Sequence, residues 1–305
     1  MTPDRELNSE SAAAVFAERE FGFTREDFRK IAGMLHADAG ILLSQTKAPL
    51  VYSRLVKRLR VLGVGSFARY CALVDSEAGA GERRQMVSAL TTNVTSFFRE
   101  PHHFEHLKTH VLPDLIEPVR QGGRLRIWSA GCSTGEEPYS IALSILDVMP
   151  DAARLDVRVL ATDISQTVLA TGEAGVYDDR SLAPVRRQLL ADWFRPSRGA
   201  DGRKTLAVGE DLRTLVAFRH LNLQEPWPMT PPYQAVFCRN VLIYFDEPGQ
   251  ADVQRRISNL LAPGGRLYLG ASERIRCAGD LRIDGVTTYR RDRPAGPMLN
   301  ATETR

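Results

Sequence analysis

Strand-like and helix-like segments alternate from residue 124 onward, and this alternation restricts the folds open to the chain. Apolar runs typical of strands lie at residues 125–130, 156–163, 215–223, 235–240 and 265–272. Amphipathic stretches typical of helices lie at residues 136–149, 167–175 and 246–262. Consecutive parallel strands need helical crossovers of this kind. We therefore predict an α/β domain with a doubly wound, mainly parallel sheet, and we expect a last strand within residues 284–292.

One connection in this alternation is too long for a simple crossover. About forty residues separate the helix at 167–175 from the strand at 215–223, and they are rich in Gly, Arg and Pro. Short alternating segments lie on either side of Asp201 and Gly202, a dipeptide typical of hairpin turns. We predict a small β subdomain inserted at about residues 176–214.

The first third of the chain has a helical pattern without strands. Thr24 is a candidate N-cap with Asp27 three residues later, and Gly40 and Gly63 stand at C-cap positions. Helices are expected at residues 24–40, 49–62, 66–73 and 82–90. The predicted organisation is a polar extension (1–23), a helical domain (24–90), a linker and helix that contribute to the ligand site (91–123), the α/β domain (124–291) and a flexible tail (292–305).

Composition excludes several classes of protein. No apolar run approaches the roughly 20 residues that span a bilayer, and the polar amino terminus does not resemble a signal peptide, so we expect a cytoplasmic protein. A net charge of +3 is too small to indicate nucleic-acid binding by itself. The four cysteines are far apart and fit neither a zinc site nor a disulfide framework, so we interpret them as reduced thiols: Cys71, Cys132, Cys238 and Cys277.

The loop after the first strand contains the first candidate site. Gly131 and Gly135 lie between that strand and a helix, where small residues let a ligand approach the sheet edge. The loop has neither the dinucleotide fingerprint nor the P-loop lysine. Glu136 and Glu137 at the start of the helix oppose a phosphate but suit a cation. A tight loop with a helix-capping acid explains the same residues without a ligand.

Further polar residues follow other strands of the predicted sheet. Asp163 ends the second strand, where an acid commonly holds ribose hydroxyls, although it can equally cap the next helix. Arg239 and Asn240 end the fourth strand, and Tyr244 follows closely. The carboxyl ends of parallel strands meet at one edge, so we expect these residues to share a site. A nucleoside with a positive charge fits this set, and S-adenosylmethionine has that description.

The segment between the two predicted domains, residues 91–100, is also a candidate. It combines Asn93 and Thr95 with Phe97, Phe98 and Arg99. A buried arginine needs an anionic partner, because an unpaired buried charge is very costly. An interdomain hinge with a salt-bridged arginine is therefore an alternative to a role in ligand binding.

These motifs together resemble the CheR-type methyltransferases, over about residues 25–291. The matching segments, in this order and spacing, are residues 91–104, 128–140, 161–165, 221–223 and 237–246. The resemblance implies a class I S-adenosylmethionine-dependent methyltransferase with a helical amino-terminal domain and an inserted β subdomain. It implies methyl transfer from S-adenosylmethionine to the γ-carboxylate of glutamates in chemoreceptor helices, with S-adenosylhomocysteine as product and no metal. The residues that match the family's cofactor-binding positions are Asn93, Thr95, Arg99, Glu137, Asp163, Asn222, Leu223, Arg239 and Asn240.

The implied reaction makes modest chemical demands. A glutamate side chain has a reference pKa of about 4.3 and is already ionised near neutral pH, so it needs no general base. It needs desolvation, alignment with the methyl group and a donor for its second oxygen. By position and by the resemblance, we predict that Arg99 and the Tyr244 hydroxyl orient the carboxylate as catalytic residues.

A basic helix face is the candidate substrate-binding surface. Arg54, Lys57 and Arg58 share one face of the helix expected at 49–62, in a stretch without acids. Such a face suits nucleic acid, an anionic membrane, an acidic protein helix or water alone. Because the resemblance implies glutamate-rich receptor helices, we interpret it as a receptor-binding face and expect neither a nucleic-acid partner nor membrane insertion. A receptor carboxy-terminal peptide at the β subdomain, as in part of the family, stays open.

Two patterns point elsewhere and are not favoured. His102, His106 and His110 have a spacing able to bind metal, but no acid completes a site, so caps and interfaces are the preferred interpretation. Residues 230–233 resemble a motif of amino-directed nucleic-acid methyltransferases, but they precede the fourth strand, whereas that motif follows it. A module that binds S-adenosylmethionine without turnover is the remaining alternative; Arg99 and Tyr244 argue against it.

Overall fold

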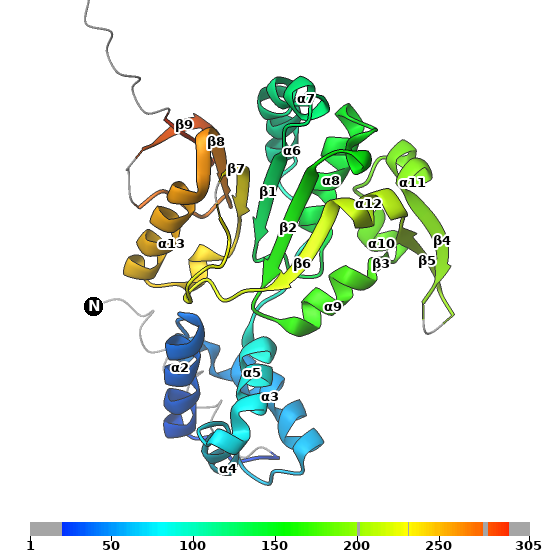
Figure 1. Ribbon diagram of the computed structural model, residues 1–305. Coiled ribbons are helices and arrows are strands. Elements are labelled where there is room, and N and C mark those ends of the chain that lie inside the picture. The colour runs from blue at the N-terminus through cyan, green and yellow to red at the C-terminus, as the bar shows by residue number, and fades with distance from the viewer. Residues whose placement is uncertain (1–19, 200–201, 231, 277–279, 293–305) are drawn as a thin grey trace, which may run out of the picture.

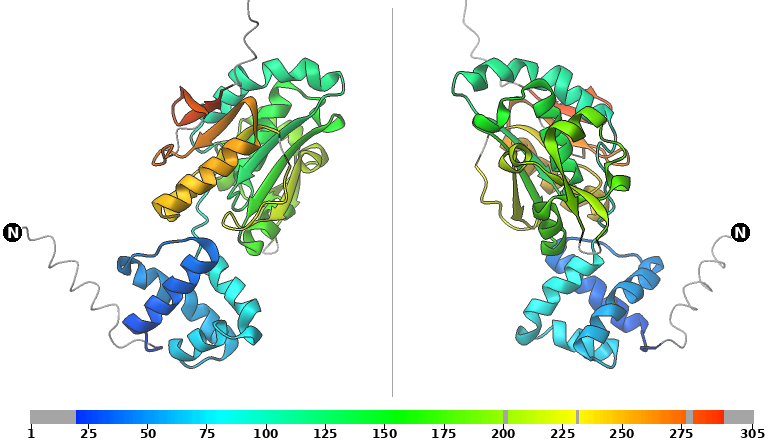
Figure 2. Two further views of the ribbon diagram at one scale, coloured as in Figure 1. Left: turned by 60° about the vertical axis from the view of Figure 1, so that its left-hand side comes forward. Right: turned by 90° about the vertical axis from the view of Figure 1, so that its right-hand side faces the viewer.

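The computed structural model describes residues 20–199, 202–230, 232–276 and 280–292. The predicted polar extension up to residue 19, the predicted flexible tail from residue 293 and Cys277 lie outside the described residues. A helical domain, blue to cyan in Figure 1, lies below a larger domain built around a sheet. The two views of Figure 2 show the same separation, with one stretch of chain leading from the helical domain into the sheet domain.

The helical domain forms where the capping residues predict it. Its helices are α2 (Arg25–Ala39), α3 (Ala48–Leu62), α4 (Phe67–Val74) and α5 (Ala80–Leu90), with short 3-10 turns at Gln45–Lys47 and Glu77–Gly79. Thr24 and Asp27 form a reciprocal capping box: the Asp27 carboxylate accepts from the Thr24 N–H at 2.9 Å. Gly40 and Gly63 end α2 and α3 in the left-handed conformation, with φ of 68° and 65°.

The larger domain contains a seven-stranded sheet in the order β6-β2-β1-β7-β8-β10-β9. Strands β1, β2, β6, β7 and β8 are parallel, whereas β10 is antiparallel to both β8 and β9. The direction of winding reverses between β1 and β7, which makes this edge a topological switch point. The strands are β1 (Leu125–Ala130), β2 (Val157–Asp163), β6 (Val216–His220), β7 (Tyr233–Cys238), β8 (Leu261–Leu269), β9 (Leu281–Gly285) and β10 (Thr288–Arg291).

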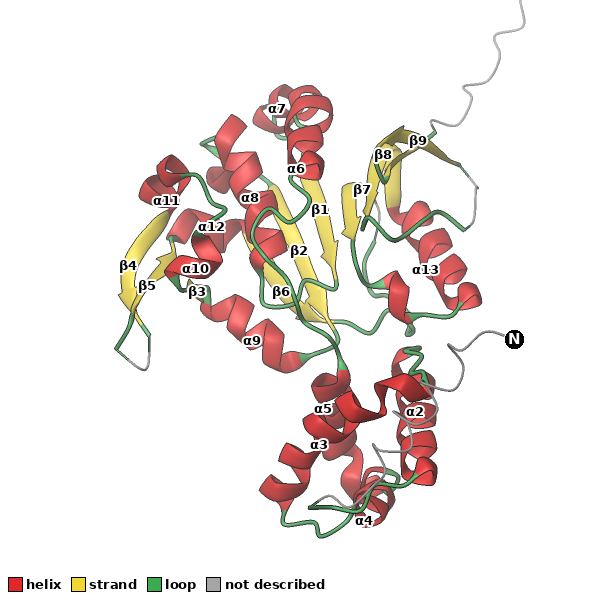
Figure 3. Ribbon diagram, turned by 180° about the vertical axis from the view of Figure 1, so that it is seen from behind, coloured by secondary structure: helices red, strands yellow, loops and turns green. Residues whose placement is uncertain are grey.

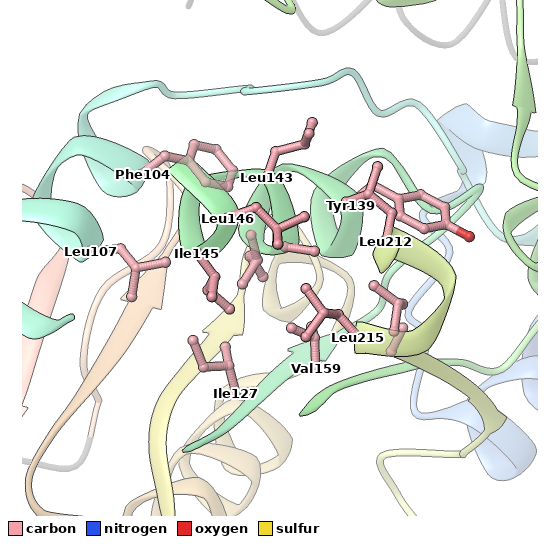
Figure 4. Packing of buried hydrophobic residues seen from close by; sticks show 14 of the residues in the cluster. Phe104, Leu107, Ile127, Tyr139, Leu143, Ile145, Leu146, Val159, Leu212 and Leu215 are labelled. Atoms are coloured by element: carbon pink, nitrogen blue, oxygen red, sulfur yellow. The ribbon is translucent and has the colours of Figure 1, made fainter. Parts of the chain in front are cut away.

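Helices cover both faces of this sheet, as Figure 3 shows. The segments are α6 (His102–His106), a π-helical turn (Leu107–Val111), α7 (Pro113–Arg120), α8 (Glu136–Val148), a 3-10 turn (Ala152–Arg154), α9 (Gln166–Ala174), a second 3-10 turn (Leu242–Tyr244) and α13 (Glu247–Leu260). Side chains of β1 alternate between the two faces: Leu125 and Ile127 pack in the core with α8, and Trp128 in the core with α13. Figure 4 shows the α8 side of this core. Two buried layers therefore hold the sheet edge in place.

The predicted insertion is a second sheet accompanied by short helices. Its three antiparallel strands have the order β3-β5-β4: β3 (Val176–Tyr177), β4 (Phe194–Arg198) and β5 (Lys204–Val208). The sequence did not indicate the helices α10 (Asp179–Leu182), α11 (Arg187–Trp193) and α12 (Glu210–Leu215). No helix in the described part of the chain combines the length and apolarity needed to cross a membrane.

Candidate active site

A pocket of about 560 Å³ opens at the carboxyl ends of the parallel strands. Figures 1 and 3 show the arrowheads of β1, β2 and β6 directed toward the helical domain, so the pocket lies between the two domains. Residues 39–50 of the helical domain contribute one wall. All ten predicted cofactor-binding and catalytic residues line it: Asn93, Thr95, Arg99, Glu137, Asp163, Asn222, Leu223, Arg239, Asn240 and Tyr244.

The glycine loop brings its backbone close to the pocket. Gly131 has φ of 77°, and a Cβ there would lie 2.3 Å from Val241 Cγ2. Glycine is therefore required both for the backbone conformation and for the close approach of β1 to the segment after β7. Glu137, in the first turn of α8, lines the pocket, and its Oε1 accepts from the Ser129 hydroxyl at 2.7 Å.

Asp163 is fixed at the end of β2 by backbone donors. Its carboxylate accepts from the N–H groups of Ser133 and Ser165, each at 2.9 Å. Burial raises the pKa of Asp163, and burial also raises the pKa of Glu137, where the Arg239 guanidinium opposes the shift. Two buried carboxylates in one pocket suit a ligand that brings hydroxyl donors and a positive charge. The donor set therefore fits S-adenosylmethionine, with its ribose and its sulfonium.

The buried arginine of the site is Arg239, not Arg99. The Arg239 side chain is 1% exposed and lies between two acids, 3.3 Å from Glu137 Oε2 and 3.5 Å from Glu100 Oε2. Its Nη2 also donates to the Arg99 carbonyl. Arg99 itself is exposed, and its Nη1 donates to the Val94 carbonyl at 3.0 Å. The salt-bridged hinge arginine that the sequence allowed for Arg99 is thus not the arrangement found among the described residues.

Unusual backbone conformations gather around the pocket. Five non-glycine residues among those described have positive φ, and four of them lie beside it: Phe98 (51°), Glu100 (57°), Ser133 (50°) and Asn240 (59°). The left-handed region costs most side chains free energy, so surrounding contacts must hold it. The Phe98 N–H, for example, donates to Ser140 Oγ at 2.9 Å. The backbone on both sides of Arg99 is therefore in a constrained conformation, which fixes where its side chain begins.

Asn222 joins the pocket to the helical domain. Its Nδ2 donates to the carbonyl of Asp38, at the end of α2, and its Oδ1 accepts from the Gln224 N–H at 3.0 Å. Ser88 of α5 and Ser165 of the sheet domain also share a hydrogen bond. The wall of the pocket that comes from the helical domain is thus tied directly to the strand ends.

The predicted basic face is largely engaged within the helical domain. Arg54 Nη1 donates to the carbonyls of Leu90, the last residue of α5, and of Thr91, its C-cap. Arg58 pairs with Glu82, whose side chain is 9% exposed, and its Nε donates at 2.9 Å. Lys57 is exposed, and no ion pair joins it to any described residue. The three predicted cations therefore differ: Lys57 has no ion pair with a described residue, whereas Arg54 and Arg58 are held against α5. Their role in receptor binding stays a prediction.

The histidines serve contacts between elements. His103 is fully buried, with Nε2 2.9 Å from the Thr287 hydroxyl, and His106 Nδ1 lies 3.1 Å from the Tyr268 hydroxyl. His106 and His110 stack with ring centroids 4.6 Å apart. Within the described residues, the cluster with metal-ligand spacing is Glu100, His102 and His103. The neighbouring Arg239 guanidinium opposes a second cation there.

Two acids that shape the site had no assigned role in the sequence. Glu100 pairs with Arg239, and Glu273 accepts hydrogen bonds from the backbone of the segment that follows β7. Both act on a neighbouring residue or on the backbone, so no motif of ligand-contacting residues could reveal them. The position of Glu100 next to Arg99 is a signal that the sequence contains, whereas its positive φ is visible in the structure alone.

Comparison with known proteins agrees with this geometry. Residues 26–91 match the model of the CheR methyltransferase all-alpha domain, and residues 93–289 match that of the CheR methyltransferase SAM binding domain. A probable chemotaxis protein methyltransferase of Rhizobium etli is 49% identical over 259 residues, which cover 84% of this chain and 96% of that protein. Chemotaxis protein methyltransferase 2 of Pseudomonas aeruginosa is 43% identical, covering 93% and 99%. The chemotaxis protein methyltransferase of Escherichia coli is 40% identical, covering 81% and 83%.

The matches and the structure divide the chain in the same way. The two family models meet at residues 91–93, where α5 ends and the pocket-lining segment begins. The second model also includes all ten pocket residues named above. The chain therefore belongs to the CheR methyltransferase family.

Proposed function

We propose that this protein transfers a methyl group from S-adenosylmethionine to the γ-carboxylate of specific glutamates in the cytoplasmic helices of chemoreceptors. The observation that carries the proposal is the pocket at the switch point, in which buried acids, Arg99 and Tyr244 meet. S-adenosylmethionine supplies an electrophilic methyl group on a sulfonium. The resulting glutamate methyl ester removes one negative charge from the receptor at each modified site.

We assign the deep part of the pocket to the cofactor. Glu137 and Asp163 are buried carboxylates held by Ser129 Oγ and by backbone N–H groups, so they present acceptors without rearrangement. Asn93, Thr95, Asn222, Leu223, Arg239 and Asn240 complete this part. Arg239 is neutralised by Glu100 and Glu137, which limits its repulsion of a cationic ligand.

The outer part of the pocket suits an acidic side chain. Arg99 is exposed there, and the contact of its guanidinium among the described residues is a hydrogen bond to the Val94 carbonyl, which leaves other N–H groups for a carboxylate. Tyr244 ends the short 3-10 turn after β7 and lines the same opening. A carboxylate oriented by both groups keeps one oxygen free for attack. No described lysine or histidine lies within the lining except Lys47, so the carboxylate acts in its ionised form without a base.

Substrate approach is assigned to the helical domain. Lys47 lines the pocket, and Lys57 lies on the exposed face of α3. We propose that Lys57 contacts acidic residues of the receptor, while Arg54 and Arg58 of the predicted face shape the surface around it. A nucleic-acid substrate gains no support, because the arginines of this face are engaged by carbonyl groups and by Glu82. A receptor peptide at the edge of the β3-β5-β4 sheet stays a proposal of its own.

The test is transfer of radiolabelled methyl from S-adenosylmethionine to a chemoreceptor cytoplasmic fragment, followed by alkali. Methyl esters release volatile methanol in alkali, so label lost on treatment, and absent when the receptor glutamates are changed to alanine, supports the proposal. Tyr244→Phe is a matched variant that keeps the ring and removes the hydroxyl. Alkali-stable label, or tight cofactor binding without transfer to any receptor fragment, would overturn the proposal.

A further inference from the structure

One buried carboxylate outside the pocket collects an unusual number of backbone donors. Glu273 is 5% exposed and follows β8. Its Oε1 accepts from the N–H groups of Val241 and Leu242 at 2.9 and 2.7 Å, with Ile243 at 3.3 Å. Its Oε2 accepts from Asn240 at 2.8 Å and Gly270 at 2.6 Å. Five N–H groups therefore converge on one side chain.

These donors belong to the segment that carries site residues. Residues 239–244 leave β7 with Arg239 and Asn240 and end at Tyr244. Four consecutive N–H groups of this segment point at Glu273, and the fifth belongs to Gly270, directly after β8. The segment is too short and irregular to satisfy these groups internally, and a buried N–H without an acceptor is costly. Glu273 thus fixes the segment against the neighbouring strand.

The charge of Glu273 has no cationic partner among the described residues; the converging N–H dipoles balance it. Such a concave arrangement of successive amides is a built anion site, and hydrogen bonds to an ionised acceptor are the stronger kind. A neutral amide in place of the carboxylate would present its NH₂ to at least two N–H donors. A negative charge with two acceptor oxygens is therefore what this position requires.

The segment is also constrained from its other side. Asn240 has φ of 59°, a left-handed conformation that Glu273 holds through the Asn240 N–H. A Cβ at Gly270 would lie 2.5 Å from Asn240 Nδ2 and 2.8 Å from its backbone nitrogen. Gly270 therefore leaves the space into which Asn240 fits. The two contacts together define where the Asn240 side chain and Tyr244 enter the pocket.

We infer that Glu273 is a positioning residue: its carboxylate holds the segment of Arg239, Asn240 and Tyr244 in the geometry that binds S-adenosylmethionine and orients the methyl acceptor. It lines no part of the pocket and acts only through the backbone it binds. Cofactor affinity depends on this anchor through Arg239 and Asn240. The methyl-transfer rate depends on it through Tyr244, and only this second effect rests on the proposed function.

The test compares Glu273→Gln with Glu273→Asp and with a remote carboxylate. Asp178→Asn is the matched control, since Asp178 caps α10 by accepting from the Ser181 N–H at 2.8 Å, away from the pocket. Binding of S-adenosylhomocysteine is measured by calorimetry, which also gives the fraction of competent sites and needs no methyl acceptor. The kcat and KM values are measured with a receptor fragment, and stability by urea unfolding.

Glu273→Gln is expected to raise the Kd for S-adenosylhomocysteine about tenfold and to lower kcat at saturating cofactor about tenfold, as unsatisfied buried donors let the segment move. Glu273→Asp, which keeps both oxygens and the charge, should recover part of each loss, and it carries the test if the glutamine variant does not fold. Asp178→Asn is expected to lower the free energy of unfolding and to leave Kd and kcat unchanged.

Unchanged Kd and kcat per competent site in both Glu273 variants, with only reduced stability, would overturn the inference. The outcome is separable from that of the proposed function. If the wild-type protein binds S-adenosylhomocysteine but methylates no receptor, the proposed function fails, and the calorimetric comparison of the Glu273 variants still decides whether this residue positions the cofactor site.

Discussion

Arg99 lies between two residues with left-handed backbone, Phe98 and Glu100, and its exposed side chain lines the pocket. Arg99→Ala is expected to lower kcat by about a hundredfold at saturating cofactor, because the attacking carboxylate loses its orienting donor. Arg99→Lys should retain part of the rate through its charge. Arg180→Ala, which removes an exposed arginine of the insertion, is the control. Full turnover by Arg99→Ala, with only weaker cofactor binding, would contradict the assigned role.

Cofactor affinity should fall in mild acid. Burial raises the pKa values of Glu137 and Asp163, so both carboxyls take up protons at a higher pH than exposed carboxyls do. Below its pKa each group loses its charge and one acceptor, and a cationic ligand binds less well. Calorimetric titration of S-adenosylmethionine between pH 8 and pH 5 should show Kd rising as pH falls, with proton release on binding. A constant Kd over this range would count against the two acids as cofactor ligands.

At the residue scale, sequence reasoning works where chain topology gathers residues. Asp163, Arg239 and Asn240 each follow a strand, and parallel strands bring such positions to one edge, so their meeting was predictable. The partners of Arg54 and Arg58 were not predictable, because α5 meets α3 only through tertiary packing. The role of Glu273 was not predictable for another reason. Its hydrogen-bond donors are backbone N–H groups, which every residue except proline has, so the sequence does not reveal them.

The helix α3 uses its cations in two different ways, which makes them separable by experiment. Arg58→Ala leaves the buried Glu82 carboxylate without its main partner and is expected to lower the free energy of unfolding by about 1–3 kcal/mol, with little change in the KM for receptor. Lys57→Ala should raise that KM several-fold and leave stability within about 0.5 kcal/mol. Urea unfolding and receptor titrations measure the two effects. A raised KM in Arg58→Ala together with lowered stability in Lys57→Ala would refute this division of roles between the two residues.

His103 holds α6 against the turn between β9 and β10, and this contact predicts a pH-dependent stability. Burial lowers the pKa of His103 to about 3, whereas the unfolded chain titrates near 6.5. Because the pKa is lowered in the folded state, the contribution of neutral His103 to the free energy of unfolding is present above pH 6.5. It is lost as pH falls toward 3. Between pH 7 and pH 5 the loss is about 2 kcal/mol. The free energy of unfolding of His103→Gln, measured against pH, should lack this loss between pH 7 and pH 5. An equal pH dependence in the wild-type protein and the variant would disprove the assignment.

Capping and turn residues made many helices and strands predictable from the sequence. The elements that were not predicted are those without such residues or a periodic pattern. Thr24, Gly40 and Gly63 mark helix ends by local chemistry, and the structure confirms each of them. Asp27 completes the capping box with a shorter side chain than the usual Glu or Gln. The short helices of the insertion and strand β9 have too few residues for a periodic signal, so packing against their neighbours decides their conformation.

The whole molecule places its pocket between two domains that are joined by several polar contacts and by packing of Ile164 and Tyr244 against the helical core. Ser88 bonds to Ser165, and Asn222 Nδ2 to the Asp38 carbonyl, while residues 39–50 and the strand ends line opposite walls. Each domain has its own buried core. Residues of both domains line the pocket, so a ligand that fills it is expected to stabilise the helical domain as well as the sheet domain.

Cofactor binding should therefore protect the helical domain although most cofactor residues belong to the sheet domain. With S-adenosylhomocysteine at a hundred times its Kd, mass action adds about 2.7 kcal/mol to the bound arrangement. Hydrogen exchange should slow at residues 39–47 and at the end of α2 as well as at the loops after β1, β2 and β7. The strand β5 of the insertion, remote from the pocket, serves as the internal control. Protection confined to the sheet domain would mean that the helical domain closes over the site only when a receptor helix is bound.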